Sequence, residues 1–312
     1  MGGSRDGLPV PPGIPTAFVR EKYMYTSITI KTKLIALLGK PLGFTKAPTM
    51  LNGAFGEAGL DYFYFPVEAT AETLPDILPA VRRMNFAGLV VTKPLKIEML
   101  RYLDAIDPLA EKTGSINTVV IKEGKFIGHN TDGLGFTRAL VDKFGKEAEG
   151  KTFFILGAGG ASRAVCFSLA ENCRAKRFVI TDVVAEAGKS LADDLAAKSG
   201  VEAVFLAPGD ARIPGEIARS DFIVNASGIG MEPHLDETPI PPEWLRPELV
   251  VCDLAYNPPK TRLLALAEKA GCRTMNGAGM VVMQGAMQFS LWTGEPEPID
   301  TMREIINKVL GL

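Results

Sequence analysis

Several features that define common protein classes are scarce or missing in this 312-residue sequence. Its four cysteines form no CxxC pair and lie in apolar or helical contexts, which predicts reduced thiols in a cytosolic protein without a metal site. A formal net charge of −2 gives no electrostatic basis for binding nucleic acid or an anionic membrane. No apolar run approaches the ~20 residues that a membrane-spanning helix needs.

The N-terminal residues also lack a targeting signal. The stretch MGGSRDGLPVPPGIPT has no apolar core of the kind that a signal peptide requires. It is rich in glycine and proline, so we expect residues 1–26 to form a flexible tail. The whole chain is 46% hydrophobic and 22% charged, an ordinary globular composition, and it is long enough for two domains with separate cores.

One stretch, residues 151–182, has the pattern of a dinucleotide-binding βαβ unit. An apolar strand at 152–156 runs into the loop GAGGAS, a helical pattern follows, and a second strand ends at Asp182, roughly 20 residues past the loop. The glycines allow a tight turn and a close backbone approach to a pyrophosphate, which the helix N-terminus would bind. We therefore expect a dinucleotide at Gly157, Gly159, Gly160 and Ala161. The alternative is a purely structural strand-to-helix turn.

Asp182 bears on which dinucleotide is bound. A carboxylate at the end of the second strand can accept hydrogen bonds from ribose hydroxyls, and it would repel a 2′-phosphate. Residues 183–186 supply no arginine or lysine to hold that phosphate. The sequence therefore favours NAD over NADP. The alternative is that Asp182 caps the following helix.

Strands and helices alternate along most of the chain, which predicts an α/β fold with parallel sheets. The expected hairpin at 114–132 leads to a domain boundary, after which a helix at 133–144 enters the dinucleotide domain. We therefore expect one α/β domain at 27–132 and a Rossmann domain at 133–278. The expected strands are 27–38, 62–67, 88–92, 152–156, 178–181, 202–206, 222–225, 249–253 and 273–276.

Three polar residues of the first half fall at loops after strands or at the domain boundary, where α/β proteins bind ligands. They are Lys96, Asn117 and Asp132. Oxidation of a secondary alcohol needs a group that takes the hydroxyl proton, and a partly desolvated lysine beside an aspartate can do this. Neither His129 nor His234 is better placed. Taken singly, Lys96 also fits a helix surface, and Asp132 also fits a turn.

Eight motifs in one order carry a family resemblance from about residue 28 to residue 310. They are GKPLGFTKAPTMLN, VTKPLK, GSINTV, GHNTDG, GAGGASRA, NASGIGM, CDLAYNPPKT and GMVVMQGAMQFSLWTG. Together they resemble the shikimate/quinate dehydrogenase family. The resemblance implies an N-terminal substrate domain, an NAD(P) domain in the second half, and C-terminal helices at 279–312 that return to the first domain. It also implies a cleft between the two domains that holds both ligands.

The resemblance also implies roles for single residues. Lys96 would accept and donate the catalytic proton, with Asp132 as its partner. Thr92, Asn117 and Gln284 would hold ring hydroxyls, although Gln284 also fits an exposed helix position. Further ligand contacts are implied for Thr45 and Tyr256 on the substrate side and for Met231 and Gly277 on the nicotinamide side, where the last two also fit packing and turn roles.

The substrate loop departs from the family pattern. Thr45 and Ala47 occupy the positions of two serines that usually donate hydrogen bonds to the substrate carboxylate, and Phe44 replaces the usual histidine. Loss of one hydrogen-bond donor would weaken carboxylate binding by about 1–3 kcal/mol, or roughly 5- to 150-fold. Val90 replaces the usual asparagine of the third strand, and Lys93 adds a cation near Lys96. The chemistry is therefore expected to be kept while the substrate pocket has changed.

These observations lead to one main hypothesis and two alternatives. The main hypothesis is a cytoplasmic, monomeric or homodimeric NAD-dependent enzyme that interconverts a cyclic polyol acid, shikimate or quinate, and its 3-dehydro ketone. The first alternative keeps this chemistry for an amino- or deoxy-substituted ring, as Ala47 suggests. The second is a non-catalytic dinucleotide-binding or ligand-binding protein on the same fold. The presence of both Lys96 and Asp132 argues against it.

Overall fold

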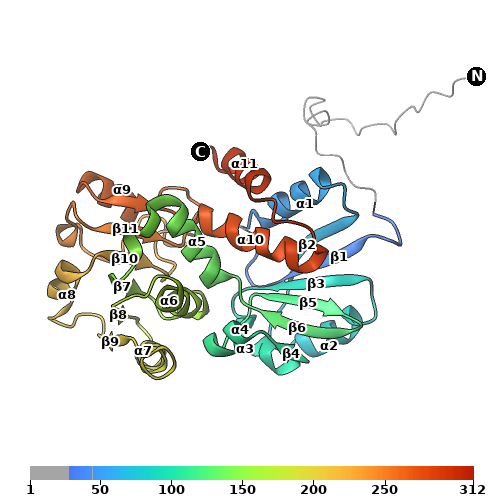
Figure 1. Ribbon diagram of the computed structural model, residues 1–312, viewed down its shortest axis with the longest axis horizontal. Coiled ribbons are helices and arrows are strands. Elements are labelled where there is room, and N and C mark those ends of the chain that lie inside the picture. The colour runs from blue at the N-terminus through green and yellow to red at the C-terminus, as the bar shows by residue number, and fades with distance from the viewer. Residues whose placement is uncertain (1–27, 44) are drawn as a thin grey trace, which may run out of the picture.

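The structure, a computed structural model, describes residues 28–43 and 45–312 (Figure 1). It contains two α/β units, each built on a six-stranded sheet, and the predicted two-domain fold class is confirmed. The expected N-terminal tail and the expected role of Phe44 lie outside the described residues. No helix in the described ranges is both long and apolar enough to cross a membrane.

The first sheet is mixed, with the strand order β2-β1-β3-β5-β6-β4. Its first three strands are parallel, whereas β5 and β6 form an antiparallel hairpin. The hairpin arises because the chain turns at Glu123 and Gly124, both of which have positive φ. The strands are β1 (Lys33–Gly39), β2 (Tyr62–Glu68), β3 (Phe86–Val91), β4 (Ala105–Ile106), β5 (Thr118–Lys122) and β6 (Lys125–His129).

Helices cover both faces of this sheet. The alternation of side chains along β1 sends Ile35 and Leu37 to one face, under α1, α10 and α11, and Ala36 and Leu38 to the other. Figure 1 shows the helix α10 running from the second unit back across the first sheet. The helices are α1 (Ala47–Glu57), α2 (Leu74–Val81), α3 (Leu95–Glu98), η1 (Met99–Tyr102), α4 (Pro108–Thr113), α10 (Ala278–Thr293) and α11 (Ile299–Leu310).

The second sheet is parallel throughout, with the order β12-β11-β10-β7-β8-β9. This is the doubly wound Rossmann order, in which successive strands are added first on one side of β7 and then, from β10 onward, on the other side. The crevice at their carboxyl ends is the ligand position of such sheets. The strands are β7 (Thr152–Leu156), β8 (Arg177–Thr181), β9 (Glu202–Phe205), β10 (Phe222–Asn225), β11 (Val250–Asp253) and β12 (Arg273–Met275).

Two close contacts position the helix α5 (Asp132–Phe144), one against α6 (Gly160–Asn172) of the same unit and one against α10, which joins it to the first unit. A Cβ built on Gly133 would lie 2.1 Å from the Ala164 oxygen of α6, and one on Gly135 would lie 2.9 Å from Cβ of Gln284 in α10. Backbones can approach this closely only because glycine has no side chain. The helices of the second unit are α5 (Asp132–Phe144), η2 (Gly145–Ala148), α6 (Gly160–Asn172), α7 (Ala185–Ser199), α8 (Ile213–Arg219), η3 (Pro242–Trp244) and α9 (Arg262–Lys269).

Candidate active site

A cavity of about 960 Å³ lies between the two sheets and is lined by residues of both units. At one end it reaches the carboxyl ends of β1 and β3, and at the other the loops after β7 and β8. Lys96, Asn117 and Asp132 line it on the first side, and Gly157 and Asp182 on the second. The structure thus brings the predicted proton-transfer residues and the predicted dinucleotide loop to one cleft.

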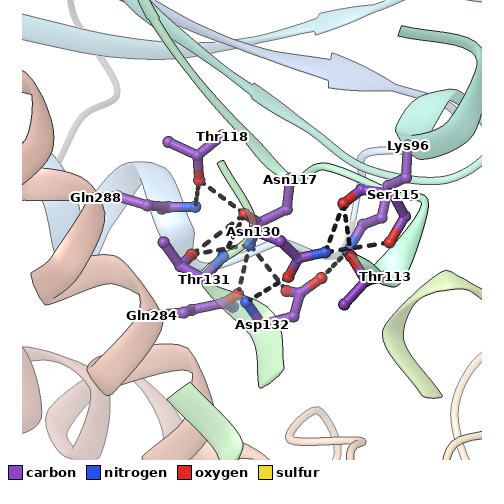
Figure 2. A network of polar contacts seen from close by, with 10 residues as sticks. All are labelled: Lys96, Thr113, Ser115, Asn117, Thr118, Asn130, Thr131, Asp132, Gln284 and Gln288. Carbon is purple, nitrogen blue, oxygen red and sulfur yellow. Dashed lines mark hydrogen bonds and ion pairs between the residues drawn. The ribbon is translucent and has the colours of Figure 1, made fainter. Parts of the chain in front are cut away.

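Lys96 and Asp132 form an ion pair inside this cleft, with the lysine Nζ bonded to Oδ2 of the aspartate (Figure 2). Their side chains are 13% and 5% exposed, so water screens the pair weakly. Lys96 lies on the short helix α3 after β3, and Asp132 is the first residue of α5. The two residues are 36 positions apart in the chain, and only the folded sheet places them together.

Asn117 holds the other side of the Asp132 carboxylate. Its Nδ2 donates to Asp132 Oδ1 and Thr131 Oγ1 at 2.9 Å and to Gln284 Oε1 at 3.2 Å. Its Oδ1 accepts from the Thr131 backbone N–H at 2.9 Å and from the Thr118 hydroxyl at 2.8 Å. The amide is buried and bonded through both ends, so it fixes the carboxylate in one orientation.

The hairpin explains why these residues meet. Thr118 pairs with His129 in the antiparallel register, so Asn117, one residue earlier, faces the residues that follow β6. The next residue of that strand end, Asn130, donates from Nδ2 to Ser115 O at 2.9 Å and accepts from the Asp132 N–H at 3.1 Å. Sequence analysis did not single out Asn130, although the GHNTDG motif contains it.

The helix α10 contributes two glutamines to the cleft. Gln284 was predicted, and the structure places it in the network rather than on an exposed helix face. Gln288 was missed: it is 4% exposed, lines the cleft and donates to Thr118 Oγ1 at 2.9 Å. Its spacing of four residues from Gln284, which places both on one helical face, is the signal that would have found it.

The other predicted substrate residues also line the cleft. They are Thr45, Thr92 and Tyr256. Thr45 Oγ1 accepts from the Ala47 N–H at 3.3 Å, and the Tyr256 hydroxyl accepts from the Lys46 N–H at 3.3 Å. Each hydroxyl therefore keeps its own proton free to donate.

The wall beside these hydroxyls is apolar. Ala47, Met50, Val90 and Val281 line it and belong to the core on the α1 and α10 side of the sheet. Tyr64, on β2, also lines this wall, and its hydroxyl is buried and has no hydrogen-bond partner among the described residues. Burial, with a further contribution from Tyr256, raises its pKa, so the hydroxyl stays neutral and keeps its proton.

The predicted dinucleotide loop has the backbone that its glycines suggest. Gly157 has φ +101°, and a Cβ there would lie 2.8 Å from the Ala226 carbonyl. Gly159 is the N-cap of α6, without a side-chain cap, and a Cβ there meets nothing within 4 Å. The first N–H groups of the helix are therefore open to an anion. Gly160 and Ala161 form the first turn, and a Cβ on Gly160 would lie 3.6 Å from Cδ of Lys96.

Asp182 is used by the protein's own backbone. Its Oδ2 accepts from the Ala158 N–H at 2.6 Å, and its Oδ1 accepts from the Val184 N–H at 2.7 Å. The first bond ties the glycine loop to the end of β8, and the second shapes the turn into α7. Both oxygens thus serve the loop geometry, which is close to the capping alternative considered above.

The remaining predicted residues lie in two different settings. Met231 lines the cleft, whereas Gly277 is packed tightly, because a Cβ there would lie 2.1 Å from the Leu254 oxygen. Lys93 reaches the nucleotide side, with its Nζ 4.0 Å from a Cβ built on Gly228. Its ammonium therefore faces the loop after β10, while the bonded partner of Lys96 is Asp132. No cluster of potential metal ligands occurs within residues 28–43 and 45–312.

A Rossmann unit that faces a second α/β unit across a cleft, with a buried lysine–aspartate pair in it, is consistent with an NAD(P)-dependent alcohol dehydrogenase. Comparisons with known proteins agree. Residues 37–119 match the shikimate dehydrogenase substrate binding domain, and residues 277–306 match the shikimate 5′-dehydrogenase C-terminal domain. The chain belongs to the shikimate dehydrogenase family, as its motifs indicated.

Full-length relatives support this assignment. The chain is 38% identical to a shikimate dehydrogenase (NADP(+)) from Moorella thermoacetica, over 91% of this chain and 96% of the relative. It is 40% identical to the enzyme of that name from Methanopyrus kandleri, over 90% and 97%. The crystal structure of shikimate 5-dehydrogenase from Listeria monocytogenes in complex with shikimate and NAD superposes with a TM-score of 0.82 at 39% identity, covering 90% of this chain and 98% of that one.

The comparisons correct one expectation. The curated relatives are named for NADP(+), so the prediction of NAD as the preferred cofactor is wrong. The structure supplies the reason. The prediction treated Asp182 as a free ribose acceptor, whereas its two oxygens are bonded to backbone N–H groups of Ala158 and Val184. The acidic residue after the second strand therefore does not indicate whether this chain binds NAD or NADP.

Proposed function

We propose that this protein catalyses the NADP-dependent interconversion of shikimate and its 3-dehydro ketone. The observation that carries the proposal is the buried Lys96–Asp132 ion pair at a cleft that also contains the open glycine loop. The names of its relatives support the substrate and the cofactor. The domain roles follow the two sheets: residues 27–132 bind substrate, 133–278 bind the dinucleotide, and 279–312 complete the substrate side.

Lys96 is the proposed proton-transfer group. In the oxidative direction its neutral amine takes the proton of the ring hydroxyl, and in the reductive direction its ammonium returns a proton to the ketone oxygen. Asp132 accepts a hydrogen bond from Nζ and so holds the lysine at the cleft. Asn117 orients that carboxylate from its other side. Its amide and that of Gln284 are the proposed ligands of the ring hydroxyls.

The dinucleotide fits the second half of the cleft. The uncapped N-terminus of α6, with open space at Gly159, suits a pyrophosphate. The carboxyl ends of β7 and β8 lie where Rossmann units bind the dinucleotide. NADP supplies the hydride acceptor or donor of the reaction. Beside Asp182, Val183 is 88% exposed, which leaves room at the adenosine side.

Initial rates with the purified protein test this proposal. Shikimate with NADP should give steady formation of NADPH, and the same reaction with Lys96→Ala should give none while NADP binding remains. Quinate and amino- or deoxy-substituted rings serve as competing substrates, because Ala47 and Val90 have changed the substrate wall. A wild-type rate with shikimate at background would reject the proposed substrate, and full activity of Lys96→Ala would reject the proposed role of the lysine.

A further inference from the structure

We propose that Tyr64 is a specificity-determining residue whose hydroxyl donates a hydrogen bond to the substrate carboxylate, in place of the serine hydroxyl that is missing at Ala47. This inference rests on the proposed function, since it takes the substrate to be a ring acid. It assigns a role to a residue of β2, a strand that contributed no residue to the predicted site.

The first step is that the Tyr64 hydroxyl has no task within the protein. The residue is 1% exposed, and its oxygen has no hydrogen-bond partner among the described residues. Buried hydroxyls are nearly always paired because an unpaired one loses its bonds to water without replacement. Tyr62, two residues earlier on the same strand, is half-buried, and its hydroxyl is paired, since it donates to Trp292 O at 3.2 Å. Tyr64 is an exception, as are Thr181 and Ser199 among the described residues.

The second step is that Tyr64 lies at the cleft. Tyr64 lines the cavity, while the strand holds its backbone beside Ile35 of β1. Its ring packs against Trp292 with the centroids 6.5 Å apart, which limits its motion. The side chain is therefore held in place at the cavity wall, and a ligand in the cavity is the available partner for its oxygen.

The third step concerns the hydrogen-bond donors on the cavity wall around Tyr64. Ala47 offers no hydroxyl, and Val90 offers only methyl groups where the family resemblance implies an asparagine. Nearby, Thr45 and Tyr256 each accept a bond from a backbone N–H and keep their own protons free. With Tyr64 they make three neutral hydroxyl donors from three elements. A carboxylate, which only accepts hydrogen bonds, fits such a set.

The test is the variant Tyr64→Phe, which removes one oxygen and keeps the ring. The KM for shikimate should rise about 10- to 150-fold, the range for losing a hydrogen bond to a charged group, while kcat and the KM for NADP stay within about twofold. The melting temperature should not fall, because the hydroxyl has no partner in the free protein. With an analogue that carries a hydroxymethyl group in place of the carboxylate, the variant and the wild type should differ far less.

Two further variants sharpen the result. Tyr62→Phe is the matched control, on the same strand but outside the cleft, and should leave the KM for shikimate unchanged. Ala47→Ser should lower the KM more in the Tyr64→Phe background than in the wild type. If wild-type turnover is normal and Tyr64→Phe leaves the KM unchanged, the inference is rejected and the proposed function stands. No wild-type turnover with shikimate would reject both.

Discussion

Asn117 and Asp132 share a hydrogen bond of 2.9 Å, from Nδ2 of the amide to Oδ1 of the carboxylate, on the opposite side of that carboxylate from Lys96. The carboxylate is thus held between an amide and an ammonium group, each on its own oxygen. This arrangement fixes the lysine at the cleft even before a ligand binds. The first two predictions below depend on it.

Removal of either member of the ion pair should abolish most turnover. We expect Lys96→Met and Asp132→Asn each to lower kcat by about 10²- to 10⁴-fold, the usual contribution of general acid–base catalysis, with NADP affinity preserved. Steady-state kinetics and a direct binding titration with NADP measure the two effects. Lys260→Met, which breaks an exposed pair with Glu268 outside the cleft, should retain full activity. An unaltered kcat in Lys96→Met would contradict the proposed mechanism.

Asn117→Ala should impair both stability and catalysis. It removes the hydrogen bonds that the amide donates to Thr131, Asp132 and Gln284, which should cost about 1–3 kcal/mol in the free energy of unfolding and lower kcat. Chemical denaturation and initial rates measure these quantities. Asn172→Ala, at an exposed position that bonds only within α6, is the control and should change neither by much. Wild-type stability in Asn117→Ala would show that the network contributes little.

Two glycines of the loop should respond differently to alanine. Gly157→Ala should reduce stability, because φ +101° is unfavourable for alanine and its Cβ would lie 2.8 Å from the Ala226 carbonyl. Gly159→Ala has open space for its Cβ, so stability should hold while the KM for NADP rises, since the methyl group would occupy the pyrophosphate position. Melting curves measured with and without NADP distinguish a loss of stability from a loss of NADP binding. An unchanged KM for NADP in Gly159→Ala would contradict the proposed pyrophosphate site at the glycine loop.

His129 should make the free energy of unfolding depend on pH. Burial, only partly opposed by Asp107 and reinforced by Lys122, lowers its pKa below 6.5. As pH falls through about 6.5, the unfolded chain therefore takes up the proton first, and stability declines until the folded-state pKa is reached. Denaturation curves between about pH 7 and 5 should show a smaller decline for His129→Asn than for the wild type.

The other histidine of the chain provides the control for that comparison. His234 lies in an exposed loop with its imidazole beside Glu237, so His234→Asn should keep the decline of the wild type. Equal pH dependence of the wild type and His129→Asn would show that burial of His129 does not affect stability in this range.

The sequence by itself determined the secondary structure of the dinucleotide unit, the fold class and the family. Residues 152–182 specify a strand, a glycine turn, a helix and a strand through apolar runs and backbone freedom, and the structure has β7, α6 and β8 there. Alternation of such units fixes an α/β fold, because buried parallel strands need helices on both faces. The order of the motifs also identified the family. These properties depend on neighbouring residues, and a single sequence is enough to read them.

Contacts between distant segments were decided by the tertiary structure. Asn117 bonds Gln284 across 167 positions, and that pairing depends on strand register and on the rotation of α10. For the same reason, the sequence did not predict the place of Gln288 in the network or the unpaired hydroxyl of Tyr64. It also predicted Asp182 as a ribose ligand, whereas the folded chain uses this carboxylate to accept hydrogen bonds from the backbone. The sequence determined which chemical groups are available, and the packing of two sheets decided which of them face the cleft, because a side chain's partners are set in three dimensions.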